Sequence, residues 1–291
     1  MTSMAGFYTS VMTIERGVAA DEPSSARGSL AVASATPVIR WWGHATVEVE
    51  LDGVRLLTDP LLLNGVTPLV RRRAIEPVLL GEPHMIDAVL ISHGHQDHLH
   101  LPSLRLLPRD TRIIVPEGLG RWLERRGFRN VEELSAGRAT FVGPVQVRAT
   151  EAMHGGTRMP LGPRAEALGY TIQGSSAIYF AGDTEVFDGM ADIAHRLDTP
   201  LAVALLPVGG WGPTLRGGHM DPSRAAAALR LLDPARAIPI HWGTYWPRGL
   251  GRLRSDRFHL PGHEFRVEAA SAAPGVHIDV LRPGEACFLA A

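Results

Sequence analysis

The stretch Ser92-His93-Gly94-His95-Gln96-Asp97-His98 places three histidines and an aspartate within six residues, directly after the apolar segment 86–91. An extended backbone projects His93 and His95 to the same side, and Asp97 and His98 follow in the turn. Histidine is the commonest metal ligand in proteins, so the pattern indicates a metal site at the end of a strand. A polar loop that holds these histidines by chance is the alternative, and the full H-x-H-x-D-H pattern disfavours it.

Three further residues of the same chemistry follow apolar, strand-like segments later in the chain. They are His154 after 145–150, Asp183 after 177–182 and His241 after 237–240. The end of a strand is where a rigid scaffold most often presents functional groups. Each residue alone is more often an ordinary loop or core residue, so the prediction depends on their combination with the first cluster.

The hydrophobic pattern predicts an α/β protein. Residues 46–51 and 54–58 alternate as half-buried strands around the turn signal Asp52-Gly53, and Gly174-Ser175 marks a second hairpin turn. Asp221-Pro222 is a favourable helix start, because Asp can cap free N–H groups and Pro fits the first helical position. Further strands are expected at 86–91, 111–115, 145–150, 167–173, 176–181, 201–206, 236–240 and 277–281, and helices at 117–126, 187–197, 222–232 and 262–272.

The strands come in two batches that are each followed by helices, which suits two stacked sheets covered by helices, a four-layer αββα sandwich. We expect a single domain over 37–291 and a loosely ordered N-terminal extension over 1–36, which is rich in Ala, Ser, Gly and Thr. The segment 61–84 is predicted to be irregular. It is interpreted either as a lid or substrate-binding insert or as an exposed charged loop without a role.

Composition narrows the function. The 29 basic residues are all arginines, which excludes Schiff-base lysine chemistry and a Walker P-loop, and the net charge of -1 gives no support for nucleic-acid binding. The single cysteine, Cys287, supports neither a disulfide framework nor a cysteine-metal site. No apolar run reaches transmembrane length and residues 1–36 lack the centre of a signal peptide, so we expect a cytoplasmic protein, with homo-oligomerisation left open.

Taken in order, the cluster and the three later residues resemble the metallo-β-lactamase superfamily. The motifs at 42–47, 57–60, 219–222 and 240–244 look like the branch that contains N-acyl-phosphatidylethanolamine-hydrolysing phospholipase D and L-ascorbate-6-phosphate lactonase, over roughly residues 38 to 285. The resemblance implies two divalent metal ions, with zinc expected and manganese or iron as alternatives. It assigns one ion to His93, His95 and His154, the other to Asp97, His98 and His241, and makes Asp183 the bridging ligand.

The resemblance also implies a metal-dependent hydrolase in which a metal-bridging hydroxide attacks the substrate. A phosphodiester of a small or lipid-like substrate is the preferred target. A lactonase or other carboxylic-ester hydrolase is the alternative within enzymes, and a non-catalytic metal-binding protein is the alternative of another class. Asp183 disfavours antibiotic hydrolysis, because β-lactamases generally lack this carboxylate. A ribonuclease is disfavoured, because the chain has neither a basic excess nor a long inserted arm.

Further roles are predicted around these ligands. Asp97, Asp59 and His219 are assigned to catalysis: Asp59 to fix the tautomer of a ligand imidazole, and His219 to donate to a developing oxyanion or leaving group. His44, Trp211 and Tyr245 are assigned to substrate binding. An Asp-Pro turn residue at 59, a backbone contact for His44 and a core role for the aromatic residues are the alternatives.

Overall fold

The structure is a computed structural model that describes residues 36–66, 68–72, 85–158, 162–210, 218–249 and 255–289. The predicted extension over 1–36, apart from Thr36, lies outside the described residues, as does Trp211. Residues 67 and 73–84 of the predicted 61–84 segment are also outside them.

The first large sheet contains the predicted hairpin at 46–58. Leu51 pairs with Val54 across the Asp52-Gly53 turn, which confirms the hairpin. Beyond the hairpin, the strands at 54–58, 88–90, 112–116 and 131–134 run parallel to one another. The strand order is β17 (Ala286–Phe288), β1 (Val38–Gly43), β2 (Thr46–Leu51), β3 (Val54–Thr58), β6 (Ala88–Leu90), β7 (Arg112–Pro116) and β8 (Val131–Leu134).

The second large sheet is also mixed. Its strands at 177–180, 201–207, 236–240 and 277–278 are parallel, whereas those at 139–142, 145–151, 168–173 and 177–180 pair antiparallel. Gln173 pairs with Ala177 around the predicted turn at Gly174-Ser175, which confirms the second hairpin. The order is β16 (His277–Ile278), β14 (Arg236–Ile240), β13 (Leu201–Pro207), β12 (Ala177–Phe180), β11 (Leu168–Gln173), β10 (Val145–Glu151) and β9 (Ala139–Val142).

Three buried clusters of apolar side chains show that the fold has four layers, as predicted. The central cluster joins residues of both sheets, such as Val47 and Ile178. A second cluster packs Leu229 and Phe265 against the outer face of the second sheet, and a third packs Leu123 against the first sheet. The covering helices are α1 (Leu101–Leu104) and α2 (Gly120–Glu124) on one side and α3 (Met190–His195), α4 (Pro222–Leu232) and α6 (Pro261–Ala272) on the other; α5 (Ser255–His259) precedes α6.

Local sequence explains the best-defined elements. In β2, Val47, Val49 and Leu51 alternate into the core and are 0 to 1% exposed. Helix α4 begins as predicted, because the Oδ1 of Asp221 accepts a hydrogen bond from the Arg224 N–H at 2.9 Å and Pro222 occupies the first turn. No helix among the described residues is long and apolar enough to cross a bilayer.

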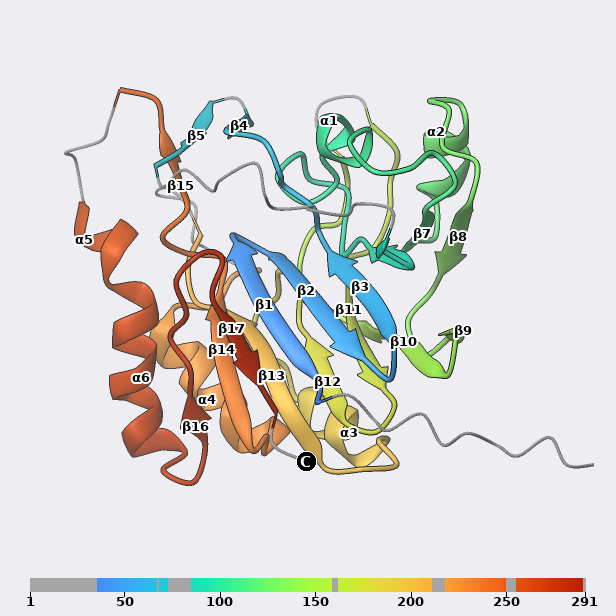
Figure 1. Ribbon diagram of the computed structural model, residues 1–291. Coiled ribbons are helices and arrows are strands. Elements are labelled where there is room, and N and C mark those ends of the chain that lie inside the picture. The colour runs from blue at the N-terminus through green and yellow to red at the C-terminus, as the bar shows by residue number, and fades with distance from the viewer. Residues whose placement is uncertain are drawn as a thin grey trace, which may run out of the picture. The chain divides into compact units, whose positions relative to one another are not determined.

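A third, small sheet corrects the prediction that 61–84 is irregular throughout. Strands β4 (Gly65–Val66) and β5 (Leu69–Arg71) form a hairpin, and β5 pairs antiparallel with β15 (Tyr245–Pro247). Figure 1 shows these three strands together, apart from the two large sheets. The sequence missed β15 because its three residues are too few to show an alternating pattern, and it missed β8 because Val131-Glu132-Glu133-Leu134 has only two apolar residues.

Candidate metal centre

The predicted ligands converge from the ends of four strands. The loop with residues 93–99, hereafter the ligand loop, follows β6, His154 follows β10, Asp183 follows β12 and His241 follows β14. His93, His95 and His154 form a first set, in which the Nδ1 of His95 lies 2.9 Å from the Nε2 of His93 and 3.2 Å from the Nε2 of His154. These three nitrogens lie close enough together to hold one metal ion.

Asp97, His98 and His241 form a second set next to the first. The Nε2 atoms of His98 and His241 are 3.3 Å apart, and Asp97 Oδ2 lies 3.7 Å and 4.0 Å from them. His44 joins this set, with its Nε2 at 3.0 Å from Asp97 Oδ2. The four side chains can hold a metal ion together.

The carboxylate of Asp183 lies between the two sets and is 2% exposed. Its Oδ2 is 3.2 Å from His98 Nε2 and 4.0 Å from His154 Nε2, and its Oδ1 is 3.3 Å from His241 Nε2. One carboxylate therefore faces nitrogens of both sets. Its buried Oδ1 has no hydrogen-bond partner among the described residues, which is costly for a charged oxygen unless a cation pairs with it.

Acceptors behind the imidazole rings fix which nitrogen faces the centre. The Nδ1 of His98 lies 2.7 Å from Asp59 Oδ2, that of His154 lies 2.7 Å from the Gly218 carbonyl, and that of His241 lies 2.5 Å from the Gly209 carbonyl. Each outer nitrogen donates its proton, so the Nε2 of each ring presents a lone pair inward when the ring is neutral. Such outer hydrogen bonds are typical of metal-bound histidines.

The distances between the inward-facing nitrogen atoms suit bound cations. Ligand atoms at about 2.0 to 2.1 Å from one tetrahedral ion lie about 3.3 Å from each other. The inward nitrogens are 2.9 to 3.3 Å apart in three pairs, namely His93 with His95, His95 with His154, and His98 with His241. Lone pairs at this separation repel one another, and a cation between them removes the repulsion. The residues present therefore fit divalent metal ions.

The protonation states also suit metal binding. Burial lowers the pKa of His241 to about 3 and that of His95 to about 4, so both rings are neutral near pH 7. Burial alone would raise the pKa of Asp183, but the imidazoles of His241 and His98 outweigh it and hold that pKa well below the usual range. Burial likewise lowers the pKa of His98, but the charges of Asp183, Asp97 and Asp59 outweigh it and raise the pKa well above its ordinary value. Without a metal, a second proton on His98 therefore takes the place of the cation.

Three residues at the centre have left-handed backbone conformations, namely His44 with φ 52°, Asp59 with φ 34° and His241 with φ 62°. Such conformations are uncommon outside glycine and persist where neighbouring contacts hold them. His44 is held by its N–H, which donates to Thr244 Oγ1 at 2.9 Å, and by its carbonyl, which accepts from the His241 N–H at 2.8 Å. The local backbone is thus shaped to aim these side chains.

The residues assigned to catalysis take different places. Asp59 is fully buried behind His98 and also accepts a 2.7 Å hydrogen bond from the Ser92 N–H, so it orients the ring without facing the centre. His219 faces the centre: its Nε2 lies 3.3 Å from Asp183 Oδ2, and 22% of its side chain is exposed. Burial lowers the pKa of His219, but the hydrogen bond to Asp183 and the charge of Asp183 together outweigh it and raise the pKa, so the ring can carry a proton.

Two of the three predicted substrate-binding residues border a recess of about 60 Å³ beside the second set, and the third, Trp211, lies outside the described residues. His44 and Tyr245 line it together with Trp242, Trp246 and Phe258. The Tyr245 hydroxyl donates to the carbonyls of Leu61 and Leu63 at 3.0 and 2.6 Å, and burial raises its pKa to about 12. Tyr245 therefore supplies an apolar ring to this wall, with its hydroxyl already engaged.

Ser92 is a site residue that the sequence reasoning missed. Its hydroxyl lies 2.5 Å from Asp59 Oδ2 and 2.9 Å from His93 Nδ1. Ser92 therefore connects the ring of His93 with Asp59, the residue that orients His98. Its position directly before the first histidine was the available signal. The carbonyls of Gly209 and Gly218 were also missed, because a backbone acceptor carries no signal of residue type.

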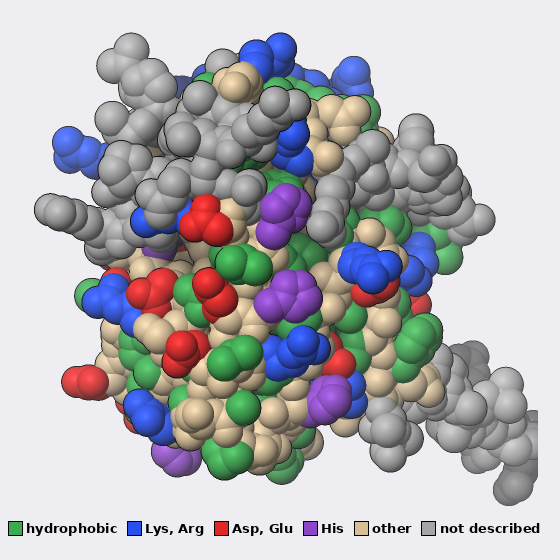
Figure 2. Space-filling view, turned by 90° about the vertical axis from the view of Figure 1, so that its left-hand side faces the viewer, with side chains coloured by type: hydrophobic (Ala, Val, Ile, Leu, Met, Phe, Trp, Pro, Cys, Tyr) green, Lys and Arg blue, Asp and Glu red, His purple; other side chains and the backbone are tan. Residues whose placement is uncertain are grey.

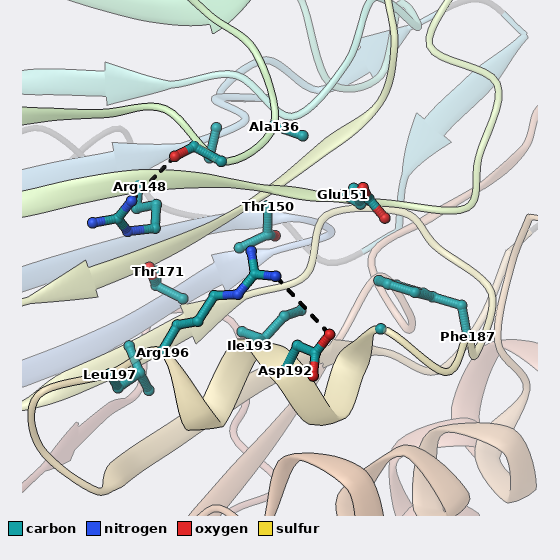
Figure 3. A pocket seen from close by; sticks show the side chains of 13 residues that line it. Ala136, Arg148, Thr150, Glu151, Thr171, Phe187, Asp192, Ile193, Arg196 and Leu197 are labelled. Carbon is teal, nitrogen blue, oxygen red and sulfur yellow. Dashed lines mark hydrogen bonds and ion pairs between the residues drawn. The ribbon is translucent and has the colours of Figure 1, made fainter.

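A separate cavity of about 210 Å³ between β10 and α3 contains none of the predicted site residues. Figure 3 shows Arg196 directed toward Asp192, and the two side chains lie 3.9 Å apart. Arg148, on the other wall, donates to the Gly137 carbonyl at 3.1 Å. Arg148, Arg196 and Asp192 therefore have partners within this cavity.

Known proteins resemble this chain over most of its length. Residues 54–242 match the family described as "Beta-lactamase superfamily domain". A "UPF0173 metal-dependent hydrolase" of Caldivirga maquilingensis is 32% identical over 250 residues, which cover 85% of this chain and 96% of the relative. The "N-acyl-phosphatidylethanolamine-hydrolyzing phospholipase D 1" of Caenorhabditis elegans is 30% identical over 227 residues, covering 70% and 63% of the two chains.

Solved structures agree with the sequence relatives. Igni18, described as a novel metallo hydrolase from Ignicoccus hospitalis KIN4/I, superposes with a TM-score of 0.68 at 26% identity, over 87% of this chain and 98% of that one. The fold, the arrangement of histidines and aspartates and the sequence relatives all agree. The chain therefore belongs to the metallo-β-lactamase superfamily and, within it, to the family of metal-dependent hydrolases.

Proposed function

We propose that this protein is a dinuclear metal-dependent phosphodiesterase that acts on a small or lipid-like substrate. The position of Asp183 supports the proposal of two metal ions, because one buried carboxylate faces nitrogens of both histidine sets. His93, His95 and His154 would hold one divalent cation, and Asp97, His98 and His241 would hold the other. Zinc is the expected metal, since imidazole and carboxylate ligands suit it, with manganese or iron as alternatives.

Bound divalent cations would lower the pKa of a water molecule to near neutrality and polarise the scissile group. The protein's own residues then complete the site. Asp59 and the Gly209 and Gly218 carbonyls hold the ligand rings in place. His219, with its raised pKa, is placed to donate a proton to the leaving oxygen.

The choice of phosphorus over carbon is supported by the relative from Caenorhabditis elegans, whose name is that of a phospholipase D. The recess lined by Tyr245, Trp246 and Phe258 supports a substrate with an apolar group next to the scissile bond. Nucleic acid is not proposed as the substrate. The net charge is -1, and the face in Figure 2 intermingles arginine with acidic side chains.

A comparison of substrates tests the reaction. The zinc-loaded protein would be assayed with bis(p-nitrophenyl) phosphate, a γ-lactone, p-nitrophenyl acetate and a thioester, and kcat/KM would be compared across them. We expect the phosphodiester to be preferred. Metal-stripped protein is the control for spontaneous hydrolysis, and a preference for the lactone with the same metal bound would move the assignment to lactone hydrolysis.

A further inference from the structure

A single arginine holds both ends of the ligand loop. The Nη1 of Arg158 donates to the carbonyl of Gly94 at 3.1 Å and to that of Leu99 at 2.7 Å. Gly94 follows the first histidine of the loop and Leu99 follows the last. Because Nη1 carries two N–H groups, it can serve both carbonyls at once and fix the width of the loop.

The same arginine belongs to the segment that supplies the third histidine of the first set. Arg158 lies four residues after His154, and the Gly94 N–H donates to the Gly156 carbonyl at 2.9 Å. A Cβ atom at position 94 would lie 2.7 Å from that carbonyl oxygen, so only glycine allows so close an approach. The 154–158 segment therefore crosses the ligand loop in direct contact with it.

An aromatic ring holds the guanidinium of Arg158. Its central carbon lies 4.9 Å from the centroid of Trp122 in α2, while Arg126 stacks on the same ring at 3.7 Å. Arg126 donates to the Trp122 carbonyl at 2.9 Å. The two arginines thus share one ring, but the contacts of Arg158 reach the ligand loop and those of Arg126 return to α2.

Charge alone does not explain an arginine at this place. A guanidinium close to a cation site repels the cation. Burial lowers the pKa of Arg158, the charge of Arg126 lowers it further, and the charge of Asp97 opposes them, which shows that Arg158 and Asp97 lie within electrostatic reach. A benefit from Arg158 must therefore come from its hydrogen bonds, and it must exceed the repulsion.

We propose that Arg158 is a positioning residue that fixes the ligand loop against the His154 segment and thereby sets how tightly the first cation position retains its metal. This inference rests on the proposed dinuclear site. The hydrogen-bond effect and the charge effect have opposite signs. Loss of the hydrogen bonds weakens metal binding, whereas loss of the charge alone strengthens it.

The matched variants Arg158→Met and Arg126→Met test this inference. Both remove one guanidinium from the Trp122 ring, but only Arg158→Met removes the contacts with the ligand loop. Metal-free protein would be titrated with Zn²⁺ against a chromophoric chelator, and release of Zn²⁺ into excess EDTA would be timed. We expect one of two zinc ions in Arg158→Met to bind about 10- to 100-fold more weakly, the usual cost of losing an outer-shell partner, and to be released faster. Arg126→Met should match the wild type.

The outcomes separate the two proposals. A wild-type protein that binds no zinc contradicts the proposed function. A wild type with two zinc ions, together with Arg158→Met that binds them equally or more tightly, overturns the role of Arg158. If circular dichroism shows that Arg158→Met does not fold, the pair Arg158→Lys and Arg126→Lys replaces it, because lysine keeps the charge and lacks the planar fork. Equal zinc release from that pair also overturns the inference.

Discussion

The substitution Asp183→Asn isolates the charge that both proposed cations share. Asparagine keeps the shape of the side chain and removes its negative charge. At an effective dielectric constant of about 20, opposite unit charges 4 Å apart attract by about 4 kcal/mol. The Asp183 oxygens lie 3.2 and 3.3 Å from the inward nitrogens of His98 and His241, so a cation held by these rings would lie within that range. If the substitution removes only half of this attraction, about 2 kcal/mol, each cation binds about 30-fold more weakly, which we take as the lower limit.

We therefore expect Asp183→Asn to lose affinity at least about 30-fold at both cation positions, whereas His154→Asn should lose it mainly at one. Metal content would be measured by mass spectrometry after equilibration in chelator-buffered zinc. Asp188→Asn is the control, because this exposed acid lies on the same connection between β12 and α3.

The metal-free state offers a second readout. The imidazoles of His241 and His98 hold the pKa of Asp183 well below its usual range, so its charge stabilises the metal-free fold at neutral pH, and Asp183→Asn should lower the melting temperature of the metal-free protein. Retention of two zinc ions at wild-type affinity by Asp183→Asn would refute the shared-carboxylate reasoning. An unchanged or higher melting temperature of the metal-free variant would contradict the stabilising pairing of Asp183 with these imidazoles.

Three further predictions concern the proton donor, the pH dependence and the support of the ligand rings. His219→Ala should keep its metal content, measured by elemental analysis, and lower kcat by a factor of about 100 or more, the usual scale for a positioned acid. Loss of metal from this variant would instead make His219 a metal ligand. The raised pKa of His98 means that a bound metal ion must displace a proton from this ring, so the affinity for metal should fall as the pH drops below that pKa. Calorimetry of metal binding in buffers of different ionisation enthalpy should detect the released proton. Metal binding without proton release contradicts this account. Asp59→Asn, which weakens the support behind His98, should lower zinc affinity about 10- to 100-fold in chelator competition, and an unchanged affinity would show that the contact with Asp59 is dispensable.

The sequence predicted the gathering of the seven proposed ligands because their signal is local. Four donors lie within the ligand loop, and His154, Asp183 and His241 each follow a hydrophobic strand within three residues. Strand ends of one layered fold meet at a common edge, so their side chains come together once the sheets form. The αββα order followed from the same hydrophobic segments.

The contacts that hold the site residues in place were less predictable, because they come from parts of the chain that are far away in the sequence. A left-handed conformation at His44 arises from contacts with residues 241 and 244, nearly 200 positions later in the chain. Strand β15 pairs with β5 through only three residues on each side. In the sequence, Arg158 looks like an ordinary loop arginine, and its contacts with the ligand loop become visible only once the chain is folded.

The 3.3 Å approach of His98 and His241 joins residues that are 143 positions apart. A cation bound by both rings would therefore act as a removable cross-link that closes a very long loop, and such closures restrict the unfolded chain strongly. The resistance of this protein to proteases would then depend on metal supply, because a chelator would open the cross-link without breaking a covalent bond. Cellular abundance, as well as turnover, would follow the availability of the metal.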